Sequence, residues 1–450
     1  MVATTFGNFY HSLISRQEED AFPYMNTLLG CKYLFFFWEQ YILYRHYRNL
    51  CSKVLPTALK GYVSEEQFRK AQAYGRDKTR CSFSKATFSL VQESLWLTCD
   101  VLPWLWGVSG RIMFRFLGLD SKHEIVQSLI FFQFKCCAEA LIELPFDFHE
   151  IFVIEERHGF NKQSWKLFIS DFVVKTLVQA VFEMPFYAGL IKVFKTGGPN
   201  FYIYAWLFVV AFQLLMTTVY PTVIMPLFNT FTPLPKGELN SMIEALANSV
   251  QFPLQKLFVV DGSKRSGHSN AYFYGFFKNR RIVLFDTLLE HSSNHETCAV
   301  LAHELGHWNY NHSFNLLAGS LFEIFIAFFL FSRIISNKDL FTSFGFSHST
   351  PTLVGYILFE FLYAPVSKIT GFFRNTVARQ YEFLADAFAC DLGYASSLSS
   401  GLIKLQLKNL ENMNPDWLYS VYHRNHPELV ERLNAIKQRV TIPSKTNKTD

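Results

Sequence analysis

Seven stretches of the chain are apolar over the ~20 residues that a membrane-spanning helix needs. They cover 26–44, 87–107, 125–146, 171–194, 201–221, 313–334 and 351–373. Charged side chains interrupt several of these windows, namely Glu39, Glu93, Asp100, Lys135, Glu139, Glu143, Asp171, Lys175, Glu183 and Glu360. A charge at bilayer depth usually faces a bundle interior or a water-filled cavity. The pattern therefore predicts a mainly α, polytopic membrane protein with a polar interior, and the alternative is that some windows are buried helices of a large soluble core.

Two polar stretches predict parts that lie outside the lipid bilayer. Residues 45–84 are strongly basic, which predicts the cytoplasmic side under the positive-inside rule, unless they form a solvated loop with no orienting role. Within 231–311, TPLPKGELNSMIEALANSV predicts an amphipathic helix. KLFVVDGSK and RRIVLFDTLL predict two strands of a small hairpin with AYFYGFFKN between them. Beyond about residue 395 the pattern is that of amphipathic helices, and we expect a disordered tail at 441–450.

Composition supports the membrane assignment and excludes several classes of protein. Half of the 450 residues are apolar, 49 are Phe, and only 18% are charged, which excludes a disordered chain, a coiled coil and a disulfide scaffold. The net charge of +5 is too mild to indicate a nucleic-acid partner. The eight cysteines include no C-x-x-C pair, so we expect neither a cysteine-bound metal nor a disulfide framework. The N-terminal segment lacks the pattern of a signal peptide, so the helices themselves are expected to direct membrane insertion.

The sharpest chemical signal is VLAHELGHW at 300–308, which contains His303, Glu304 and His307. On a helix, the H-E-x-x-H spacing puts two imidazoles on one face, and their nitrogens can share one zinc ion at about 2.0–2.1 Å. Glu304 projects next to them, where it can take a proton from the attacking water. The motif sits directly before an apolar window, and it predicts a zinc site of catalytic type.

A catalytic zinc site needs a third protein ligand. The position where a metzincin has its third histidine is Ser313, and His312 falls off the ligand face, which predicts a surface or capping histidine. Glu382 in NTVARQYEFLADAFA is the better candidate, with Asp386 one helical turn beyond it on the same face. One carboxylate could bind the metal while the other accepts the far N–H of a zinc-bound histidine. The alternative is an exposed acidic pair on an amphipathic helix.

Taken together, several blocks of sequence resemble the CAAX prenyl protease 1 (Ste24-type) zinc metalloproteases. The likeness runs from about residue 25 to 437 and is carried by FVIEERHGFN (152–161), PLFNTFTPLP (226–235), DGSKRSGHSNAYFYGFFKNRRIVLFDTLL (261–289), VLAHELGHW (300–308), RQYEFLADAFA (379–389) and HPELVERLNAI (426–436). The resemblance implies about seven transmembrane helices that enclose a large water-filled chamber, capped by the zinc domain. It also implies one zinc ion per chain held by His303, His307 and Glu382, with Glu304 as the general base.

The resemblance further implies a function and a location. Family members lie in the endoplasmic reticulum and inner nuclear membranes and cleave the last three residues from prenylated C-a-a-X proteins, and some make a second, upstream cut. Asn270 matches an asparagine that holds the substrate backbone, His426 a donor to the developing oxyanion, and Arg432 a residue that orients carboxylates or substrate. Without the family pattern, His426 would be a helix-start histidine before Pro427 and Arg432 an ordinary surface arginine.

The chain departs from the family pattern in two places. Ala378 replaces a serine that often precedes the third ligand, while Asn375 and Arg379 are retained. The segment 290–300 is short, so any function of the long insertion that some members carry there is absent.

Two other functions compete with the prenyl-protease reading. An intramembrane quality-control protease without prenyl specificity would use the same catalytic residues, so sequence cannot separate it. A membrane scaffold with a vestigial zinc site is opposed by the intact set of His303, Glu304, His307 and Glu382.

These inferences divide the chain into five expected parts. They are a membrane region with five spans and a cytosolic loop at 45–84 (1–230), the soluble part of a metalloprotease domain with its zinc helix (231–312), two further spans (313–373), the C-terminal part of the metalloprotease domain (374–440) and the tail (441–450).

Overall fold

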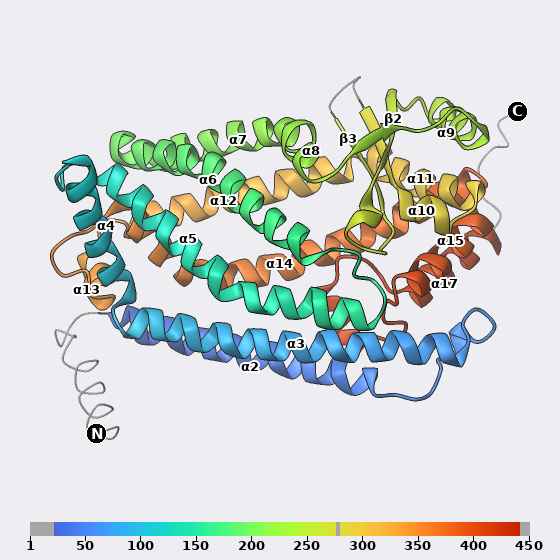
Figure 1. Cartoon of the computed structure of the whole chain (residues 1–450), viewed down its shortest axis with the longest axis horizontal. Coiled ribbons are helices and arrows are strands. Elements are labelled where there is room, and N and C mark those ends of the chain that lie inside the picture. Colours follow the sequence, from blue (N-terminus) through green and yellow to red (C-terminus); the bar gives the residue numbers. More distant parts are fainter. Residues whose placement is uncertain (1–21, 276–279, 442–450) are drawn as a thin grey trace, which may run out of the picture.

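The computed structural model describes residues 22–275 and 280–441. Long helices run along the length of the molecule, and a small sheet with shorter helices lies at one end (Figure 1). The helices of the first half are α2 (Tyr24–Leu50), α3 (Glu65–Thr98), α4 (Val101–Leu117), α5 (Glu124–His149), α6 (Trp165–Thr196), α7 (Phe201–Val219) and α8 (Met225–Phe228). Those of the second half are α9 (Glu238–Ser249), α10 (Asp286–His291), α11 (Asn294–Asn309), α12 (His312–Ile334), α13 (Lys338–Ser343), α14 (Thr352–Asp391), α15 (Ala395–Lys408), α16 (Trp417–His423) and α17 (Leu429–Thr441).

Two long helices pass into π-helical turns, which often mark functional sites. α5 continues through η2 (Glu150–Glu155), and α7 continues through η4 (Tyr220–Ile224) into α8. Short 3-10 turns connect other elements: η1 (Thr57–Leu59), η3 (Gly198–Asn200) and η5 (Gly262–Lys264).

Four helical segments of the described residues are long and apolar enough to cross a membrane. They are Glu124–Glu155, Gly198–Phe228, His312–Ile334 and Thr352–Asp391. Large apolar side chains on these segments point outward, for example Leu214, Phe322 and Phe373, which are 50–65% exposed. Such extended apolar exposure is unusual for a soluble monomer and fits contact with lipid. The predicted helical membrane architecture is confirmed, whereas the count of seven spans stays a prediction.

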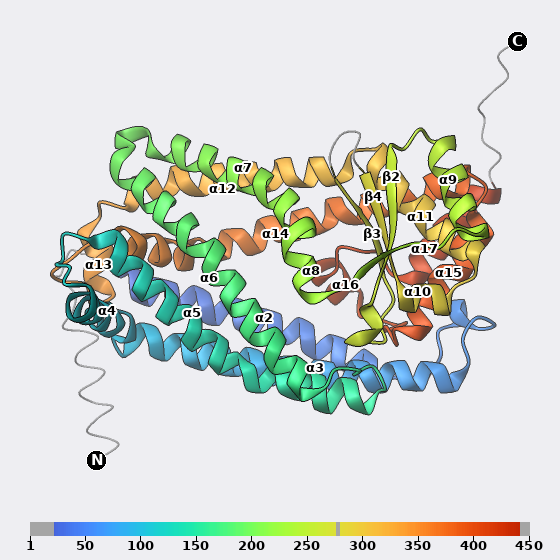
Figure 2. The same cartoon turned by 45° about the horizontal axis from the view of Figure 1, so that its top comes forward.

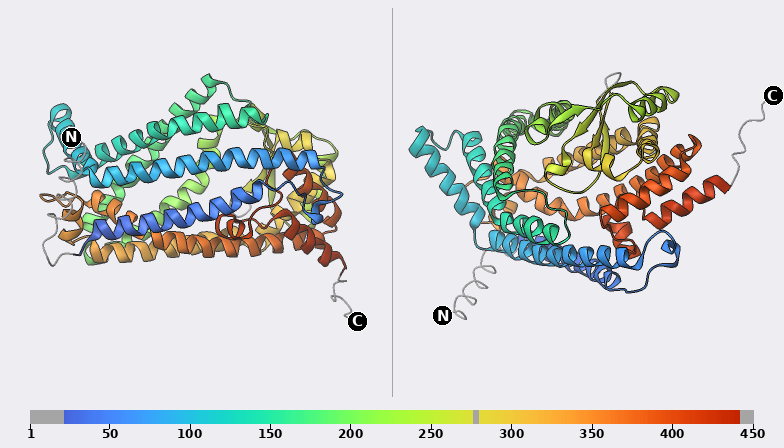
Figure 3. Two further views of the ribbon diagram at one scale, coloured as in Figure 1. Left: turned by 90° about the horizontal axis from the view of Figure 1, so that it is seen from below. Right: turned by 45° about the vertical axis from the view of Figure 1, so that its right-hand side comes forward.

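Two sequence expectations about the N-terminal half need correction. The window 87–107 is not one helix, because the chain turns at Asp100, whose φ of 54° is left-handed, between α3 and α4. The basic stretch 45–84 is not mainly a loop, since α2 runs to Leu50 and α3 begins at Glu65. A capping box formed by Ser64 and Gln67 starts α3 this early, because it satisfies backbone donors at the helix end. Seen from below, α2 and α3 (blue) run side by side along the molecule (Figure 3).

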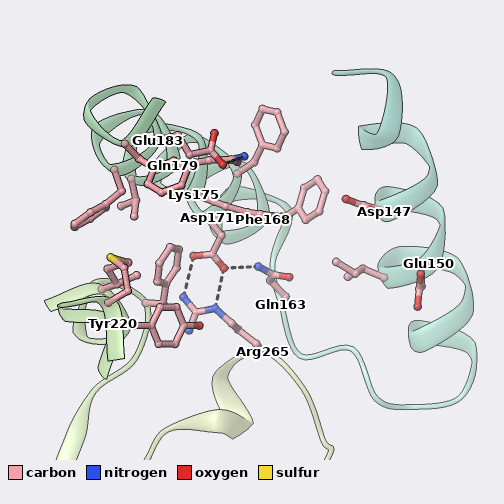
Figure 4. Close-up of a pocket in the computed structure, with 18 of the residues that line it drawn as sticks. Asp147, Glu150, Gln163, Phe168, Asp171, Lys175, Gln179, Glu183, Tyr220 and Arg265 are labelled. Carbon is pink, nitrogen blue, oxygen red and sulfur yellow. Dashed lines mark hydrogen bonds and ion pairs between the residues drawn. The ribbon is translucent and has the colours of Figure 1, made fainter. Parts of the chain in front are cut away.

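A large cavity of about 1090 Å³ lies between α5 with η2, α6, α7 and η4. Phenylalanines supply much of its wall, and Asp171, Lys175 and Glu183 also line it. The expectation that charged residues of the apolar windows face the interior of the helix bundle therefore holds for these three, which face this cavity. Figure 4 shows Asp171 and Arg265 of the cavity wall pointing toward each other, with Gln163 beside them.

The sheet has four strands in the order β1-β2-β4-β3, which stand together at one end of the molecule (Figure 2). They are β1 (Phe231–Pro233), β2 (Leu254–Val260), β3 (Ala271–Tyr274) and β4 (Arg280–Phe285). The predicted hairpin between the two long strand segments is wrong, because β2 and β4 are parallel neighbours. The segment expected as their connection forms β3, which pairs antiparallel with β4. Its AYFY sequence is rich in aromatic residues, which favour strands, and residues 276–279 lie outside the described part of the chain.

A separate hydrophobic core joins this sheet to the helices of the C-terminal half. Its buried residues come from α9, from β2 to β4, and from α11, α14, α15 and α17. The predicted helix after TPLPKG is α9, and the predicted amphipathic helices beyond residue 395 are α15 to α17. Thr441 ends α17, and the rest of the expected tail lies outside the described residues, as does the N-terminal segment before residue 22.

Candidate metal centre

Helix α11 carries the H-E-x-x-H motif, and polar contacts fix where this helix begins. Ser293 and Glu296 form a capping box at its N-terminus. Glu296 is buried and also accepts hydrogen bonds from Ser400 and Lys404 of α15. This buried carboxylate therefore anchors α11 to α15, three turns before the motif ends.

Helix α14 crosses α11 at very short range and brings the third candidate ligand to the motif. A Cβ added at Gly306 would lie 2.9 Å from the Cα of Ala385, so glycine is what permits this approach. At the crossing, His307 Nε2 lies 3.1 Å from Glu382 Oε1, and His303 Nε2 lies 3.4 Å from Glu382 Oε2. The two histidine Nε2 atoms are 3.2 Å apart.

These separations fit a tetrahedral metal ion. Ligands at about 2.0–2.1 Å from a tetrahedral zinc are ~3.3 Å from one another. The ligand atoms of His303, His307 and Glu382 lie within 4.8 Å of one another, and His303 and Glu382 are buried. Two imidazole nitrogens and one carboxylate oxygen are also the donor set of many catalytic zinc sites. The residues present therefore suit a metal ion with an open fourth position.

The ring of His303 has a second polar partner at Nδ1, on the side away from the ligand cluster. Asp386 Oδ1 lies 2.8 Å from His303 Nδ1, as the sequence predicts, and Arg432 donates to both oxygens of Asp386 at 2.8 and 2.6 Å. Fixing Nδ1 in this way leaves Nε2 directed toward the ligand cluster.

The prediction of a surface position for His312 is wrong. It is buried rather than at the surface, its Nδ1 lies 3.0 Å from that of His307, and its ring stacks on Tyr381 at 4.0 Å. The reason is the turn at Asn311, whose φ of 54° folds the start of α12 back beside the end of α11. The helical spacing from His307 could not show this turn, although a histidine only five residues after His307 suggests a contact with the motif.

The remaining candidates line one cleft of about 330 Å³ together with His303 and Glu382. Its walls include Glu304, Asn270, His426 and Arg432. Burial raises the pKa of the Glu304 carboxyl, which moves it toward the range in which a carboxylate exchanges protons near neutral pH. His426 Nδ1 lies 2.8 Å from Glu382 Oε2, and its side chain is 59% exposed. Asn270 is exposed at the start of edge strand β3.

The segment that carries His426 is held by α14. Arg379 donates to the backbone carbonyl of His426 at 2.9 Å and to Glu431 at 2.7 Å. Asn375 donates to the carbonyl of Tyr422 at 3.1 Å. Arg379 thus holds the backbone at His426, and Asn375 holds the same segment at Tyr422. These contacts need no side chain at Ala378.

Comparisons with known proteins agree with this geometry. Residues 45–230 match the family model described as CAAX prenyl protease N-terminal, five membrane helices, and residues 233–440 match peptidase family M48. A protein of Arabidopsis thaliana named CAAX prenyl protease 1 homolog is 45% identical over 417 residues, which cover 92% of this chain and 98% of the relative. The chain belongs to peptidase family M48. Its described helices and its ligand cluster are those of a multi-pass membrane metallopeptidase.

Two other proteins are similar to this M48 peptidase over the same share of its length. A human protein named CAAX prenyl protease 1 homolog is 40% identical and covers 92% of this chain and 96% of its own length. The crystal structure of Ste24p from S. mikatae superposes with a TM-score of 0.88 at 38% identity, covering 92% of this chain and 99% of that one. The resemblance inferred from sequence blocks is therefore confirmed.

Proposed function

We propose that this M48 peptidase is a zinc endopeptidase that removes the last three residues of prenylated C-a-a-X proteins in the endoplasmic reticulum membrane. The main support for this proposal is the complete cluster of His303, His307 and Glu382. The chain that carries it matches proteins named CAAX prenyl protease 1 along nearly their whole length. The Phe-lined cavity of about 1090 Å³ also offers room for a substrate with a long apolar group.

The proposed mechanism is amide hydrolysis. His303, His307 and Glu382 would hold the metal ion, which would supply Lewis-acid chemistry to the scissile carbonyl and to the attacking water. Glu304 accepts the proton of the attacking water and passes it to the leaving amine. His426 donates to the oxyanion that develops on the substrate, a contribution of about 2.7–4 kcal/mol for a well-placed donor.

Other residues position these groups. Asp386 holds the His303 ring through Nδ1, and Arg432 in turn holds Asp386. Asn270 stands at the edge of the sheet, where its amide can hold the substrate backbone next to the cleft.

The test compares a farnesylated C-a-a-X peptide with its unprenylated twin, using the full chain purified in detergent. We expect cleavage of the prenylated peptide, lost on chelation and restored by zinc. Glu304→Gln should lower kcat by about 10²–10⁴-fold with the metal content unchanged, since it removes the base and no ligand. Glu290→Gln, an exposed carboxylate outside the cleft, is the matched control. Equal cleavage of both peptides would instead support a protease without prenyl specificity, and full activity of Glu304→Gln would exclude the assigned base.

A further inference from the structure

A second cavity of about 670 Å³, which we call the distal cavity, adjoins the cleft at the ligand cluster. Both are lined by Ser269, Asn270, Asn409, Glu411 and Arg424. The far wall of the distal cavity is made by α2 and α3, which contribute His46, Tyr74 and Lys78 among others. A peptide that crosses the metal centre along Asn270 can therefore continue into the distal cavity.

The lining changes from apolar to basic along this path. Next to the ligand cluster, Leu398, Leu402 and Leu405 of α15 form an apolar wall, which suits aliphatic side chains. The distal cavity instead has two permanent cations, Lys78 and Arg424, against one lining acid, Glu411, and two histidines, His46 and His268. The large Phe-rich cavity lies on another side, where Arg265 belongs to its wall.

Arg424 occupies the junction of the two cavities. It precedes His426 by two residues, a span of at most ~7 Å along the chain, and His426 Nδ1 lies 2.8 Å from Glu382. Its side chain is 30% exposed, and one guanidinium nitrogen, Nη1, lies 3.1 Å from Glu428. A guanidinium presents five N–H donors in a planar fork, so it can hold Glu428 and still offer an edge to a second carboxylate.

Two further polar groups lie on the far wall, and the ammonium of Lys78 is already paired there with two carboxylates. Lys78 Nζ lies 2.8 Å from Glu150 and 3.2 Å from Glu155, and Glu155 also accepts a hydrogen bond from Tyr74 at 2.5 Å. His46 is 4% exposed, and its Nδ1 has no hydrogen-bond partner among residues 22–275 and 280–441. A buried polar atom without a partner is costly unless a ligand or water satisfies it.

We propose that the distal cavity binds the free C-terminal carboxylate of the substrate, with Arg424 as its ion-pair partner. This inference rests on the proposed function, because three residues then follow the cleaved bond. Three extended residues span about 10 Å, which carries the carboxylate past the leucine wall to the junction at Arg424. Binding of this carboxylate would thus fix the cleaved bond at three residues from the C-terminus of the substrate.

The test uses two farnesylated peptides that differ only at the C-terminus, one a free acid and one an amide. The full-length wild-type enzyme in detergent should cleave the acid with at least about tenfold higher kcat/KM, because a charge-assisted pair is lost with the amide. Arg424→Gln should bring the ratio of acid to amide close to one. Lys78→Met should change the ratio much less than Arg424→Gln, because the Lys78 ammonium is already paired with Glu150 and Glu155.

Glu428→Gln is the matched control, since it breaks the same Arg424–Glu428 pair but keeps the guanidinium, and it should keep the wild-type preference. Equal cleavage of acid and amide by the wild-type enzyme would overturn the carboxylate site while leaving the prenyl-protease function intact. The same loss of preference in Glu428→Gln as in Arg424→Gln would also overturn it. Failure to cleave the prenylated acid at all would overturn the proposed function itself.

Discussion

Two buried carboxylates, Asp386 and Glu296, each hold several side chains in place around helix α11. Asp386 is 2% exposed, and it contacts both His303 and Arg432. Burying such a charge is tolerated because it is paired, and removing one member of a buried pair typically costs about 3–5 kcal/mol. Glu296 has a comparable position at the start of α11, where Ser293, Ser400 and Lys404 surround it.

Glu296 should make stability depend on pH at the acidic end. Burial alone would raise its pKa, but the hydrogen bonds from Lys404, Ser400 and Ser293 outweigh burial and hold the pKa at about 2. An unfolded Glu titrates at ~4.3, so this stabilisation, up to about 3 kcal/mol, is complete above that pH and is lost as the pH falls toward 2. Glu296→Gln should therefore lower the melting temperature by a few degrees at pH 7, and the difference from wild type should shrink below about pH 4. Thermal unfolding from pH 7 to pH 3 checks this, with the exposed Glu244→Gln as control, and a pH-independent difference would contradict it.

At the scale of elements, the crossing of α11 and α14 builds the site. Neither helix holds a complete ligand set, since two ligands lie on α11 and one on α14. α14 is 40 residues long, and its first part is buried among membrane helices while Glu382 lies near its end. The same helix therefore connects the membrane region to the chemistry.

Gly306→Ala tests whether this crossing sets the ligand geometry. The new methyl group would meet the backbone of Ala385, with its Cα at 2.9 Å and its carbonyl oxygen at 3.2 Å, so the helices must separate. We expect a loss of about 1–3 kcal/mol in stability and weaker metal binding, measured by zinc titration with a competing chelator. Gly319→Ala on α12 is the control, because nothing lies within 4 Å of its added Cβ. Wild-type zinc affinity in Gly306→Ala would show that the close approach is not needed.

For the whole molecule, the segment 262–270 is the link between the N-terminal helices and the metal centre. Arg265 forms two hydrogen bonds of 2.8 Å with Asp171 of α6 (Figure 4), and His268 Nε2 lies 3.3 Å from Glu155 of η2. Asn270 ends this segment. The membrane helices therefore hold the strand edge that is proposed to hold the substrate.

Asp171→Asn should loosen this link without touching the ligands. We expect kcat/KM for the prenylated peptide to fall about tenfold, mainly through KM, with zinc content unchanged, since loss of a charged hydrogen-bond partner costs roughly 1.5–3 kcal/mol. Asp147→Asn is the matched control, because Asp147 lines the same cavity but pairs with Lys85 of α3 at 3.6 Å. Loss of zinc from Asp171→Asn would contradict a purely positioning role.

Features that repeat within one helix could be predicted from the amino-acid sequence alone. Apolar windows, the i and i+4 histidines, and the spacing of Glu382 and Asp386 all follow from helical periodicity, which is local. These patterns predicted the helical membrane fold and the candidate ligands, and the sequence blocks predicted the family.

Features that depend on the path of the chain between elements could not be predicted in this way and are visible only in the folded structure. The turn at Asn311 buries His312, the left-handed Asp100 divides a predicted span, and the parallel pairing of β2 with β4 replaces the expected hairpin. A single backbone turn redirects a whole helix or strand, and its effect appears only in contacts between residues distant in sequence. For the same reason the distal cavity, where α2 and α3 meet the segment around Arg424, has no local signal in the sequence.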